Sequence, residues 1–494
     1  MNKYLIGIDV GTTGTKSMLL SETGRIVAHA YAEYPSQAPG TGRVEQNAED
    51  WWRAVVKTVR AITADPQVAR NVAAISLSLQ GGTLVPVDKN NHPLHPAIVW
   101  SDKRCEEQRR AFLARYGEDY IYQKTGWHLG SGLNALQIAW LRDNAPDVFA
   151  RTARFLSVPD YISMRMTGRA VVDISDVGIN QLADIRTGRY DRGILDFVGI
   201  REDRLAEIVP SATPVGKLLP AAAEELGLPR SVLLVAGAHD QYAALLGAGI
   251  TRTGDVMIGT GTAWVVTALT EEPCFESGFA QSIPASGKWG SLVSLSTGGV
   301  CLDWFRNGVA GSPAEGMGYG EINDIAPERG VGVRGLRFYP YFNGTSFPLK
   351  GAGFKATLAG LDLSHDRYDI ARAVMEGVAM QTVWTLDYFR RKFPLNRVIL
   401  TGGASKSPFW TQMVADIANC PISTPMVSDL TCVGAGVMAG VGCGLFPSCE
   451  EGIGRFALAE TVYEPAPARA ARYEEVLEDF KRGAQALAGL YPKS

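Results

Sequence analysis

The sequence lacks a recognisable cysteine framework. Its seven cysteines form no CxxC pair and no regular spacing, and its six histidines form no cluster of the metal-binding type. We therefore expect reduced thiols, a cytoplasmic location and no zinc site.

The chain also lacks a run of about 18 uninterrupted apolar residues, the length that crosses a bilayer. Its first residues, MNKYLIGIDVG, contain no apolar segment followed by a cleavage site. Neither charge is in excess, because 48 Lys and Arg face 51 Asp and Glu, a net charge of −3. We therefore expect no membrane partner, no secretion and no nucleic-acid partner, since a broad basic surface is missing.

What the sequence does contain is a repeated pattern of strand, Gly/Thr tip and strand. The first copy covers residues 4–20 with the tip Gly11–Thr15, and the second covers 255–266 with the tip Gly259–Thr262. With 494 residues, the chain is long enough for two or three lobes. The repeat predicts a duplicated α/β architecture of two lobes around a central cleft, divided near residue 248 into residues 1–248 and 249–494.

Helical patterns support this α/β class. Residues 49–64 and 369–392 show apolar side chains at helical spacing. Residues 397–400 predict a strand that enters Gly402 and Gly403, after which Ser407 and Pro408 predict the start of a helix to residue 419. Strand, glycine turn and helix is an arrangement that suits a nucleotide.

The first tip has the chemistry of a triphosphate site. Glycines let the backbone approach an anion, while threonine hydroxyls and Lys16 supply donors and positive charge. One such tip is also what an ordinary hairpin turn requires, and it is the repeat that favours phosphate binding. A Walker A loop is excluded, because Thr15 and not glycine precedes Lys16.

Two aspartates end apolar strands. Asp9 is either a ligand of magnesium-bound water beside the phosphates or a turn residue that accepts from nearby amides. Asp240 follows the apolar run 232–236 and lies either at the ligand-facing edge of a sheet or at a helix N-cap. For His239 we expect local packing, because the sequence shows no partner for it.

Polar groups also follow two further strand-like runs, at Gln80–Thr83 and Trp100–Arg104. An aromatic ring together with amide, carboxylate and guanidinium groups is the mixture that binds polyhydroxylated ligands. Core packing of Trp100 and a solvated face for the basic residues is the alternative.

Taken together, these segments resemble the FGGY carbohydrate kinase family, of the actin-like (ribonuclease H-like) fold, and within it the xylulokinase-like branch. The likeness covers nearly the whole chain. IGIDVGTTGTK resembles the first phosphate loop, AGAHDQYAALLGAG the segment of the catalytic aspartate, IGTGTAW the second phosphate loop and LTGGASKSPFWTQMVADI the adenosine loop. Residues 356–376 match the family's C-terminal signature.

The resemblance implies a role for each matching residue. Asp240 would be the catalytic base and Asp9 would lie near Mg²⁺. The ATP-binding residues would be Thr12, Thr13, Thr15, Lys16, Gly259, Thr260, Gly402, Gly403, Ala404 and Ser407. The sugar-binding residues would be Gln80, Gly81, Gly82, Trp100, Asp102 and Gln241.

Two departures from the family concern the substrate. Typical xylulokinases have Gln-Met-His-Gly where this chain has Gln80–Thr83, so the sugar-contacting histidine is missing and we expect a roomier, less polar pocket there. The family's first signature has lysine where Gln137 stands.

The sequence thus predicts an ATP- and Mg²⁺-dependent kinase of a ketose or polyol, D-xylulose or a close relative. Kinases of ribulose, glycerol or gluconate are the alternatives, and a homodimer is one oligomeric state open to the chain. A non-catalytic actin-like ATP-binding module would not need both Asp240 and Gln241. A dinucleotide oxidoreductase would rest on Gly434–Gly436 and Gly440, whose spacing is loose.

Overall fold

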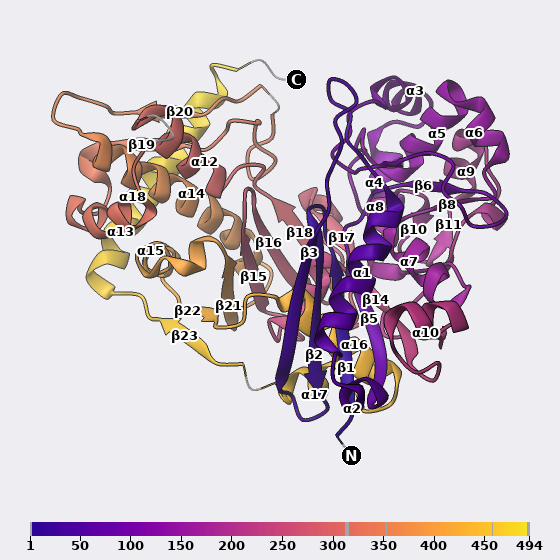
Figure 1. Ribbon diagram of the computed structural model, residues 1–494. Helices are drawn as coiled ribbons and strands as arrows, with labels where there is room; N and C mark the ends of the chain where they lie inside the picture. The colour runs from indigo at the N-terminus through magenta and orange to yellow at the C-terminus, as the bar shows by residue number, and fades with distance from the viewer. Residues whose placement is uncertain (1, 312–315, 352, 457, 492–494) are drawn as a thin grey trace. The chain divides into compact units, whose positions relative to one another are not determined.

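The structure, a computed structural model, describes residues 2–311, 316–351, 353–456 and 458–491 (Figure 1). The chain forms two compact units. Unit 1 comprises residues 1–251, 270–291 and 429–457, and unit 2 comprises 252–269, 292–428 and 458–494. The units are therefore not two continuous halves, because two segments of the C-terminal half belong to unit 1. The division of roles between residues 1–248 and 249–494 stays a prediction.

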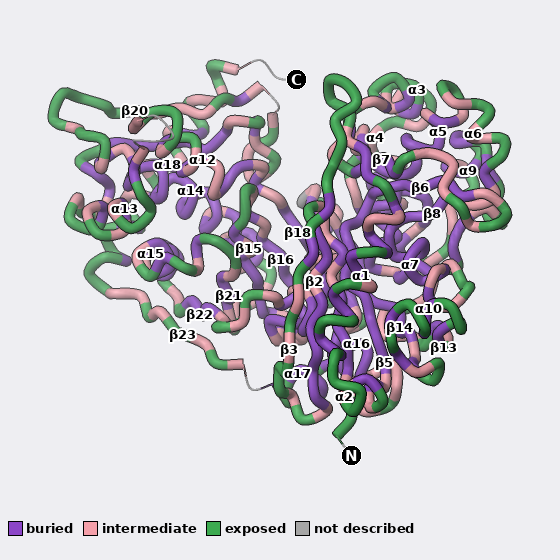
Figure 2. The backbone as a smooth tube through the Cα atoms, viewed as in Figure 1, coloured by how far each residue is buried: buried purple, intermediate pink, exposed green. Residues whose placement is uncertain are grey.

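Unit 1 is built on a six-stranded sheet with the order β13-β14-β5-β1-β2-β3. Its strands are β1 (Tyr4–Val10), β2 (Gly14–Ser21), β3 (Ile26–Glu33), β5 (Val72–Leu79), β13 (Pro214–Lys217) and β14 (Leu233–His239). β1 and β2 form the predicted antiparallel hairpin, while β1, β5 and β14 run parallel. Most residues of these three strands are buried, as the purple colour of the backbone in Figure 2 shows, whereas edge strand β3 is largely exposed.

The parallel strands end at one edge of this sheet. Val10 of β1 pairs with Leu79 of β5, and Leu79 pairs with His239 of β14. The segments that follow these strands therefore emerge side by side, at the carboxyl edge where ligands bind in open α/β sheets.

Helix α1 (Ala48–Ile62) is the predicted helix of residues 49–64 and packs on β2 and β3. Helix α16 (Leu430–Gly442) comes from far along the chain, as its orange colour among the indigo strands of Figure 1 shows, and packs on β1, β5 and α11 (Asp240–Gly247). Glycines allow this close approach, because a Cβ on Gly434 would lie 1.9 Å from the carbonyl oxygen of Ala243. The glycines considered for a dinucleotide therefore lie inside a helix and not in a strand-to-helix turn, which argues against that alternative.

The rest of unit 1 consists of short elements. Its helices are α2 (Pro66–Arg70), α3 (Glu106–Tyr116), α4 (Glu118–Thr125), α5 (Asn134–Asn144), α6 (Pro146–Arg151), α7 (Val158–Thr167), α8 (Ile174–Asn180), α9 (Arg192–Val198), α10 (Pro220–Leu226) and α17 (Cys449–Gly454). Its short strands are β4 (Glu45–Gln46), β6 (Val85–Val87), β7 (Ala97–Ile98), β8 (Arg154–Leu156), β9 (Val171–Asp173), β10 (Ala183–Asp184), β11 (Arg189–Tyr190), β12 (Glu207–Val209) and β17 (Ala280–Ser282).

Unit 2 repeats the hairpin. Strands β15 (Asp255–Thr260) and β16 (Trp264–Thr270) pair antiparallel, and β15 pairs in parallel with β21 (Arg397–Gly402). Next to β21 lie β22 (Ile422–Pro425) and β23 (Glu460–Tyr463). Thr260 and Gly402 are register partners, so the second Gly/Thr tip and the glycine turn after β21 lie at one edge.

The helices of unit 2 follow the predicted pattern. α14 (Arg367–Arg390) is the helix predicted for residues 369–392, and α15 (Pro408–Ala418) begins after the N-cap Ser407 as predicted. The other elements are α12 (Gly299–Trp304), α13 (Tyr319–Ile325), β19 (Arg337–Tyr339), β20 (Thr357–Ala359) and α18 (Pro467–Ala488). Strand β18 (Trp289–Ser294) has residues in both units, because unit 1 ends there at Ser291. Among the described residues, none of the helices combines the length and apolar character needed to cross a bilayer.

Candidate active site

The carboxyl edge of the unit 1 sheet holds two acidic side chains. Asp9 is the last residue but one of β1, and Asp240 directly follows β14 as the first residue of α11. The helix N-cap is His239, so the alternative of Asp240 as the N-cap is wrong by one residue. The side chain of Asp240 is 35% exposed, which leaves it open to a ligand.

Asp9 is held in an environment that favours its protonated form. Burial, and then the nearby charge of Asp240, raise the pKa of Asp9 to about 6. The hydrogen bond from Ser78 Oγ to Asp9 Oδ1, 2.9 Å long, and the charge of Lys16 oppose this rise. A bound cation would offset the repulsion between the two carboxylates.

The side chain of His239 lies close to the carboxylate of Asp240. Its Nδ1 lies 3.3 Å from Oδ1 of Asp240, while its ring packs against Trp127 and Tyr242 with centroid distances of 6.0 and 5.9 Å. The expectation of local packing is confirmed, and the histidine also borders the candidate base.

The first Gly/Thr tip leaves its donors at different depths. Thr13 is exposed and Thr12 is half-buried, whereas Thr15 is fully buried in β2, which does not favour contact between its side chain and a nucleotide. Lys16 is half-exposed, and its Nζ lies 2.8 Å from Oδ1 of Asp429. Burial alone would lower the pKa of Lys16, but the ion pair with Asp429 raises it, so the side chain carries a positive charge beside the tip.

Hydrogen bonds from three side chains outside the hairpin, those of Gln80, Gln46 and Trp100, fix the first tip. The amide of Gln80, which is buried, accepts from Thr12 Oγ1 at 3.2 Å and donates to the carbonyl oxygen of Gly11 at 3.3 Å. Gln46 donates to the carbonyl oxygen of Thr12 at 2.6 Å, and Trp100 Nε1 donates to Thr12 Oγ1 at 3.2 Å. Gln80 thus supports the first tip. Contact of Gln80, or of the half-exposed Trp100, with the sugar stays a prediction.

Because Gln80 supports the tip that the resemblance assigns to ATP, we expect Gln80→Leu to raise the KM for ATP roughly tenfold, since each lost hydrogen bond is worth about 1 kcal/mol. The KM for the acceptor should change by less than about twofold, well below the effect of one lost hydrogen bond. Steady-state kinetics with each substrate varied in turn measures both, and Gln67→Leu on the exposed face of α2 is the control. An increase confined to the acceptor KM would instead assign Gln80 to the sugar.

The expectation of a roomier, less polar pocket at Gly81 and Gly82 is wrong. A Cβ on Gly81 would lie 2.5 Å from Ile179 Cγ2, 2.6 Å from Asp176 Oδ1 and 2.8 Å from His239 Cδ2. Gly82 has φ +74°, and a Cβ there would lie 2.6 Å from Leu133 Cδ2. Neighbouring side chains, including a carboxylate and an imidazole, take the space that the missing Met and His would fill.

The remaining sugar-binding candidates differ in their availability. Both carboxylate oxygens of the buried Asp102 are engaged, by the backbone of Val44 and by Arg104 at 2.7 to 2.9 Å, which does not favour direct contact with a substrate. Gln241, in the first turn of α11, is half-buried. Gln137, in place of the family's lysine, donates to the carbonyl oxygens of Gly82, Ile98 and Gly132, and so fixes the glycine loop.

In unit 2 the second tip borders a cavity of about 430 Å³. Thr260, Gly403, Ala404 and Ser407, four of the residues that the resemblance assigns to ATP, line it. Their contact with a nucleotide stays a prediction. Thr260 Oγ1 donates to the carbonyl oxygen of Thr401 at 2.6 Å and accepts from Ala404 N at 3.0 Å, so it joins the tip to the glycine turn. Gly259, in the strand itself, pairs with Val265 and Thr401.

The two glycines of the turn have different roles. Gly402 has φ +96°, and a Cβ on it would lie 2.5 Å from the carbonyl oxygen of Thr260, so this position requires glycine. At Gly403 a Cβ would lie 3.4 Å from the same oxygen, an ordinary contact. Gly402 therefore shapes the turn, and Gly403 presents its backbone to the cavity.

Sequence reasoning did not single out the other residues of the cavity wall. Some lie in the motifs already named, the second tip, the adenosine loop and the signature segment: Gly261, Thr262, Lys406, Trp410 and Met375. The others come from segments without a motif: Gly299, Leu302, Asp303, Tyr319, Ile322 and Asn323. Asn323 Oδ1 accepts a 2.6 Å hydrogen bond from the hydroxyl of the N-cap Ser407. The sequence analysis indicated Ser407 but not Asn323.

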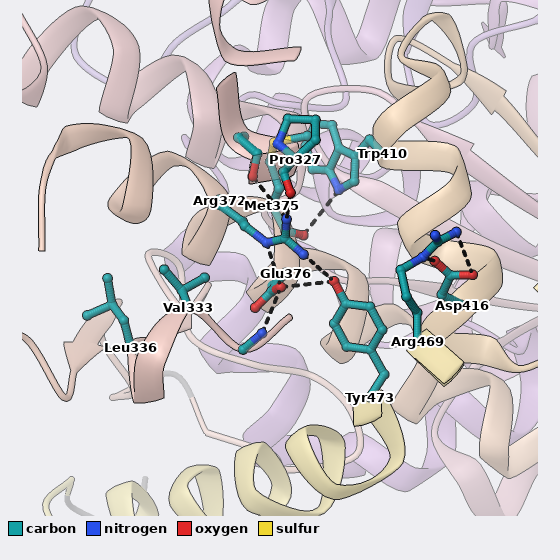
Figure 3. A network of polar contacts seen from close by, with 12 residues as sticks. Pro327, Val333, Leu336, Arg372, Met375, Glu376, Trp410, Asp416, Arg469 and Tyr473 are labelled. Carbon is teal, nitrogen blue, oxygen red and sulfur yellow. Dashed lines mark hydrogen bonds and ion pairs between the residues drawn. The ribbon is translucent and has the colours of Figure 1, made fainter. Parts of the chain in front are cut away.

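A buried polar network fixes one wall (Figure 3). Arg372 of α14 donates to Glu376 at 3.0 Å and to Tyr473 of α18 at 3.2 Å, and Tyr473 donates to Glu376 at 2.9 Å. Trp410 Nε1 donates to the carbonyl oxygen of Met375, between these residues on α14. The end of the signature segment 356–376 thus supports the cavity wall, because Met375 lines the cavity and Arg372 and Glu376 belong to the buried network beside it.

Comparison with known proteins agrees with this arrangement. Residues 4–247 match the N-terminal domain, and residues 256–443 the C-terminal domain, of the FGGY family of carbohydrate kinases. A xylulose kinase of Bacillus subtilis (strain 168) is 29% identical over 97% of this chain and 96% of its own length, and a gluconokinase of the same strain is 28% identical over 89% and 87%. The crystal structure of a xylulose kinase from Lactobacillus acidophilus superposes with a TM-score of 0.91 at 25% identity, covering 99% of each chain.

Proposed function

Because the chain belongs to the FGGY family of carbohydrate kinases, with the two-lobe actin-like fold, we propose that it transfers the γ-phosphoryl group of ATP to a hydroxyl of a ketose or polyol, D-xylulose or a close relative. The observation that carries the proposal is the placement of Asp9 and Asp240 at one edge of the unit 1 sheet, beside the first Gly/Thr tip.

Asp240 would remove the proton of the acceptor hydroxyl as its oxygen attacks the γ-phosphorus, and ADP would leave. The role suits a partly exposed carboxylate at a strand end. The amides and hydroxyls of the first tip, with Lys16, would hold phosphate oxygens, and the unit 2 cavity would hold the adenosine. Phosphoryl transfer asks for little more than such positioning and charge neutralisation.

The residues present fit a magnesium ion. The described residues contain no group of three His, Cys, Asp or Glu side chains that could hold a metal by themselves. Mg²⁺ usually keeps several waters and binds through one or two carboxylates and the substrate's phosphates, and Asp9 supplies such a carboxylate where a second negative charge lies near. When bound, the ion would neutralise charge on the transferring phosphate.

The experiment is an ADP-release assay of the purified protein over D-xylulose, D-ribulose, glycerol, other polyols and gluconate. The proposal expects ADP release that depends on a ketose or polyol, together with a phosphorylated product. ADP release that is the same with and without every acceptor would contradict it and favour the ATP-binding module.

The environment of Asp9 gives a pH prediction. Since burial raises the pKa of Asp9 to about 6 and the ionised form is needed beside Mg²⁺, kcat/KM for ATP should fall as the pH is lowered through about 6. Below that pH, the fall should approach about tenfold per unit, as for a single group. A pH profile from 5 to 8 measures it, with Asp9→Asn expected to be far less active and to lack this limb. A wild-type profile that stays level through this range would exclude the role.

A further inference from the structure

A small cavity lies inside unit 1, lined by residues of helices α5, α7 and α8 and of strands β8, β9 and β11. Its volume is about 20 Å³, and a cavity needs at least about 10–15 Å³ to hold one water molecule. The polar residues of its wall are Asn134, Ser157, Asp160, Asn180 and Tyr190, and the other lining residues are apolar. The cavity therefore has room for one water-sized particle beside a group of polar side chains.

Two amide oxygens of this wall have no hydrogen-bond partner among the described residues. They are Oδ1 of Asn134, at the start of α5, and Oδ1 of Asn180, at the end of α8. The two residues are 2% and 7% exposed, and a buried oxygen left unpaired is costly. The Asn180 amide donates from Nδ2 to Asp176 Oδ2 at 3.3 Å, so the opposite orientation would place its oxygen against a carboxylate.

The hydroxyl groups of the wall have no hydrogen left to give. Ser157 Oγ donates to Asp160 Oδ1 at 2.5 Å, and Tyr190 Oη donates to the carbonyl oxygen of Ala206 at 2.7 Å. The carboxylate of Asp160 only accepts when it is ionised. A particle in the cavity therefore meets amide, carboxylate and hydroxyl oxygens.

A water molecule satisfies such a wall only in part. It donates two hydrogens, whereas Asn134, Asn180 and the ionised Asp160 each present oxygen acceptors. Its own oxygen would in turn receive no hydrogen from the two hydroxyl groups, because both already donate elsewhere. A cation pairs with all of these oxygens at once.

The buried charge around the cavity also favours a cation. Burial raises the pKa of Asp160 to about 7 and that of Asp176 well above its usual range, and the charges of Asp173 and Asp160 add to the rise at Asp176. The main groups that oppose these rises are hydrogen-bond donors, such as Ser157 and Asn180, and not basic side chains. A positive ion beside Asp160 would lower its pKa, so the ion and a proton compete for the same carboxylate.

We propose that this cavity binds one dehydrated monovalent cation, Na⁺ or K⁺, through the oxygens of Asn134, Asn180 and Asp160. Mg²⁺ does not fit, because it usually keeps several waters and the cavity has room for one particle. A single lining carboxylate balances one positive charge, and oxygen ligands without His or Cys suit a hard cation. This site is separate from the proposed magnesium ion beside Asp9 and goes beyond the proposed function.

The ion would join three helices near the candidate base. Asn134 begins α5, Asp160 lies in α7 and Asn180 ends α8. Helix α8 is in turn tied to the end of β14, because Ser175 Oγ accepts from the backbone N–H of His239 at 2.9 Å. We therefore expect the ion to stabilise unit 1 and to take no part in the reaction itself.

The test measures thermal unfolding of the purified protein in KCl, NaCl and choline chloride at equal ionic strength, without ATP and with a chelator of divalent ions. Choline is too large for the cavity. Asp160→Asn removes the charge and keeps the shape, while Asn134→Leu removes an oxygen ligand. The matched controls are Asp173→Asn, a buried acid that also accepts from a serine, Ser175, but does not line the cavity, and Asn144→Leu at the exposed end of α5.

We expect the Tm of the wild type to be about 2 °C or more higher in KCl or NaCl than in choline chloride, with a rise that saturates as the salt concentration increases. Both controls should keep this rise, and each folded cavity variant, Asp160→Asn or Asn134→Leu, should lose it.

Two results would overturn the inference. Equal Tm values of the wild type in the three salts would leave the cavity to a water molecule. A rise that the folded cavity variants keep, or that the controls lose as well, would place the ion elsewhere. Because the readout is unfolding without ATP, none of these outcomes depends on phosphoryl transfer, so failure of the inference and failure of the proposed function are distinguishable.

Discussion

Replacement of Asp240 by asparagine is expected to lower kcat by roughly 10²–10⁴-fold, the usual contribution of a general base. Asparagine keeps the shape of the side chain but cannot take up the proton of the acceptor hydroxyl. Because Asp240 is 35% exposed and begins α11 after β14, the change should leave the fold intact. The KM for ATP should stay within about threefold, since the base acts on the acceptor.

The measurement is single-turnover phosphoryl transfer at saturating ATP and acceptor. The matched control is Asp196→Asn on α9, an exposed aspartate whose nearest ion pair, with Arg192, is 4.0 Å long. Retention of more than about a tenth of wild-type turnover in folded Asp240→Asn would rule out a general base at this position.

The two carboxylates and the two tips could be found in the sequence because each depends on short-range information. Asp9 and Asp240 end apolar strands, and the Gly/Thr tips are bounded by alternating apolar residues. The structure places both acids at one edge because β1, β5 and β14 are parallel, a consequence that α/β topology makes general. The alternative reading of Asp240 as a helix N-cap differs from the structure by one residue, because α11 begins at Asp240.

The surroundings of Gly81 could not be found in this way. Asp176 and His239 come near Gly81 only through the packing of α8 against the end of β14. Counting the side chains missing from Gly81 and Gly82 predicted an open pocket, because the sequence does not show which neighbours fill the space. The buried network of Arg372, Glu376 and Tyr473 likewise joins residues about a hundred positions apart.

The turn after β21 provides the second prediction of large effect. Gly403→Val should weaken ATP binding roughly 10- to 100-fold, because its side chain would project into the 430 Å³ cavity of unit 2 where the nucleotide's adenosine is proposed to bind. The variant should fold, since a Cβ at this position lies 3.4 Å from Thr260 O and the backbone φ is −63°. Calorimetry with ATP and with the acceptor measures the two affinities, and acceptor binding should be unchanged.

The neighbouring glycine makes this test specific. Gly402→Ala forces a side chain onto φ +96° and to 2.5 Å from the carbonyl oxygen of Thr260, so it should lower the free energy of unfolding by about 1–3 kcal/mol. Gly454→Val, where a Cβ meets nothing within 4 Å, controls for the substitution itself. We expect the two variants to behave in opposite ways: Gly403→Val should lose ATP affinity, and Gly402→Ala should lose stability. This pattern requires that Gly402 shapes the turn and that Gly403 faces the nucleotide. If Gly403→Val folds and binds ATP with wild-type affinity, the adenosine does not bind in this cavity, because a valine side chain at position 403 would occupy the same space.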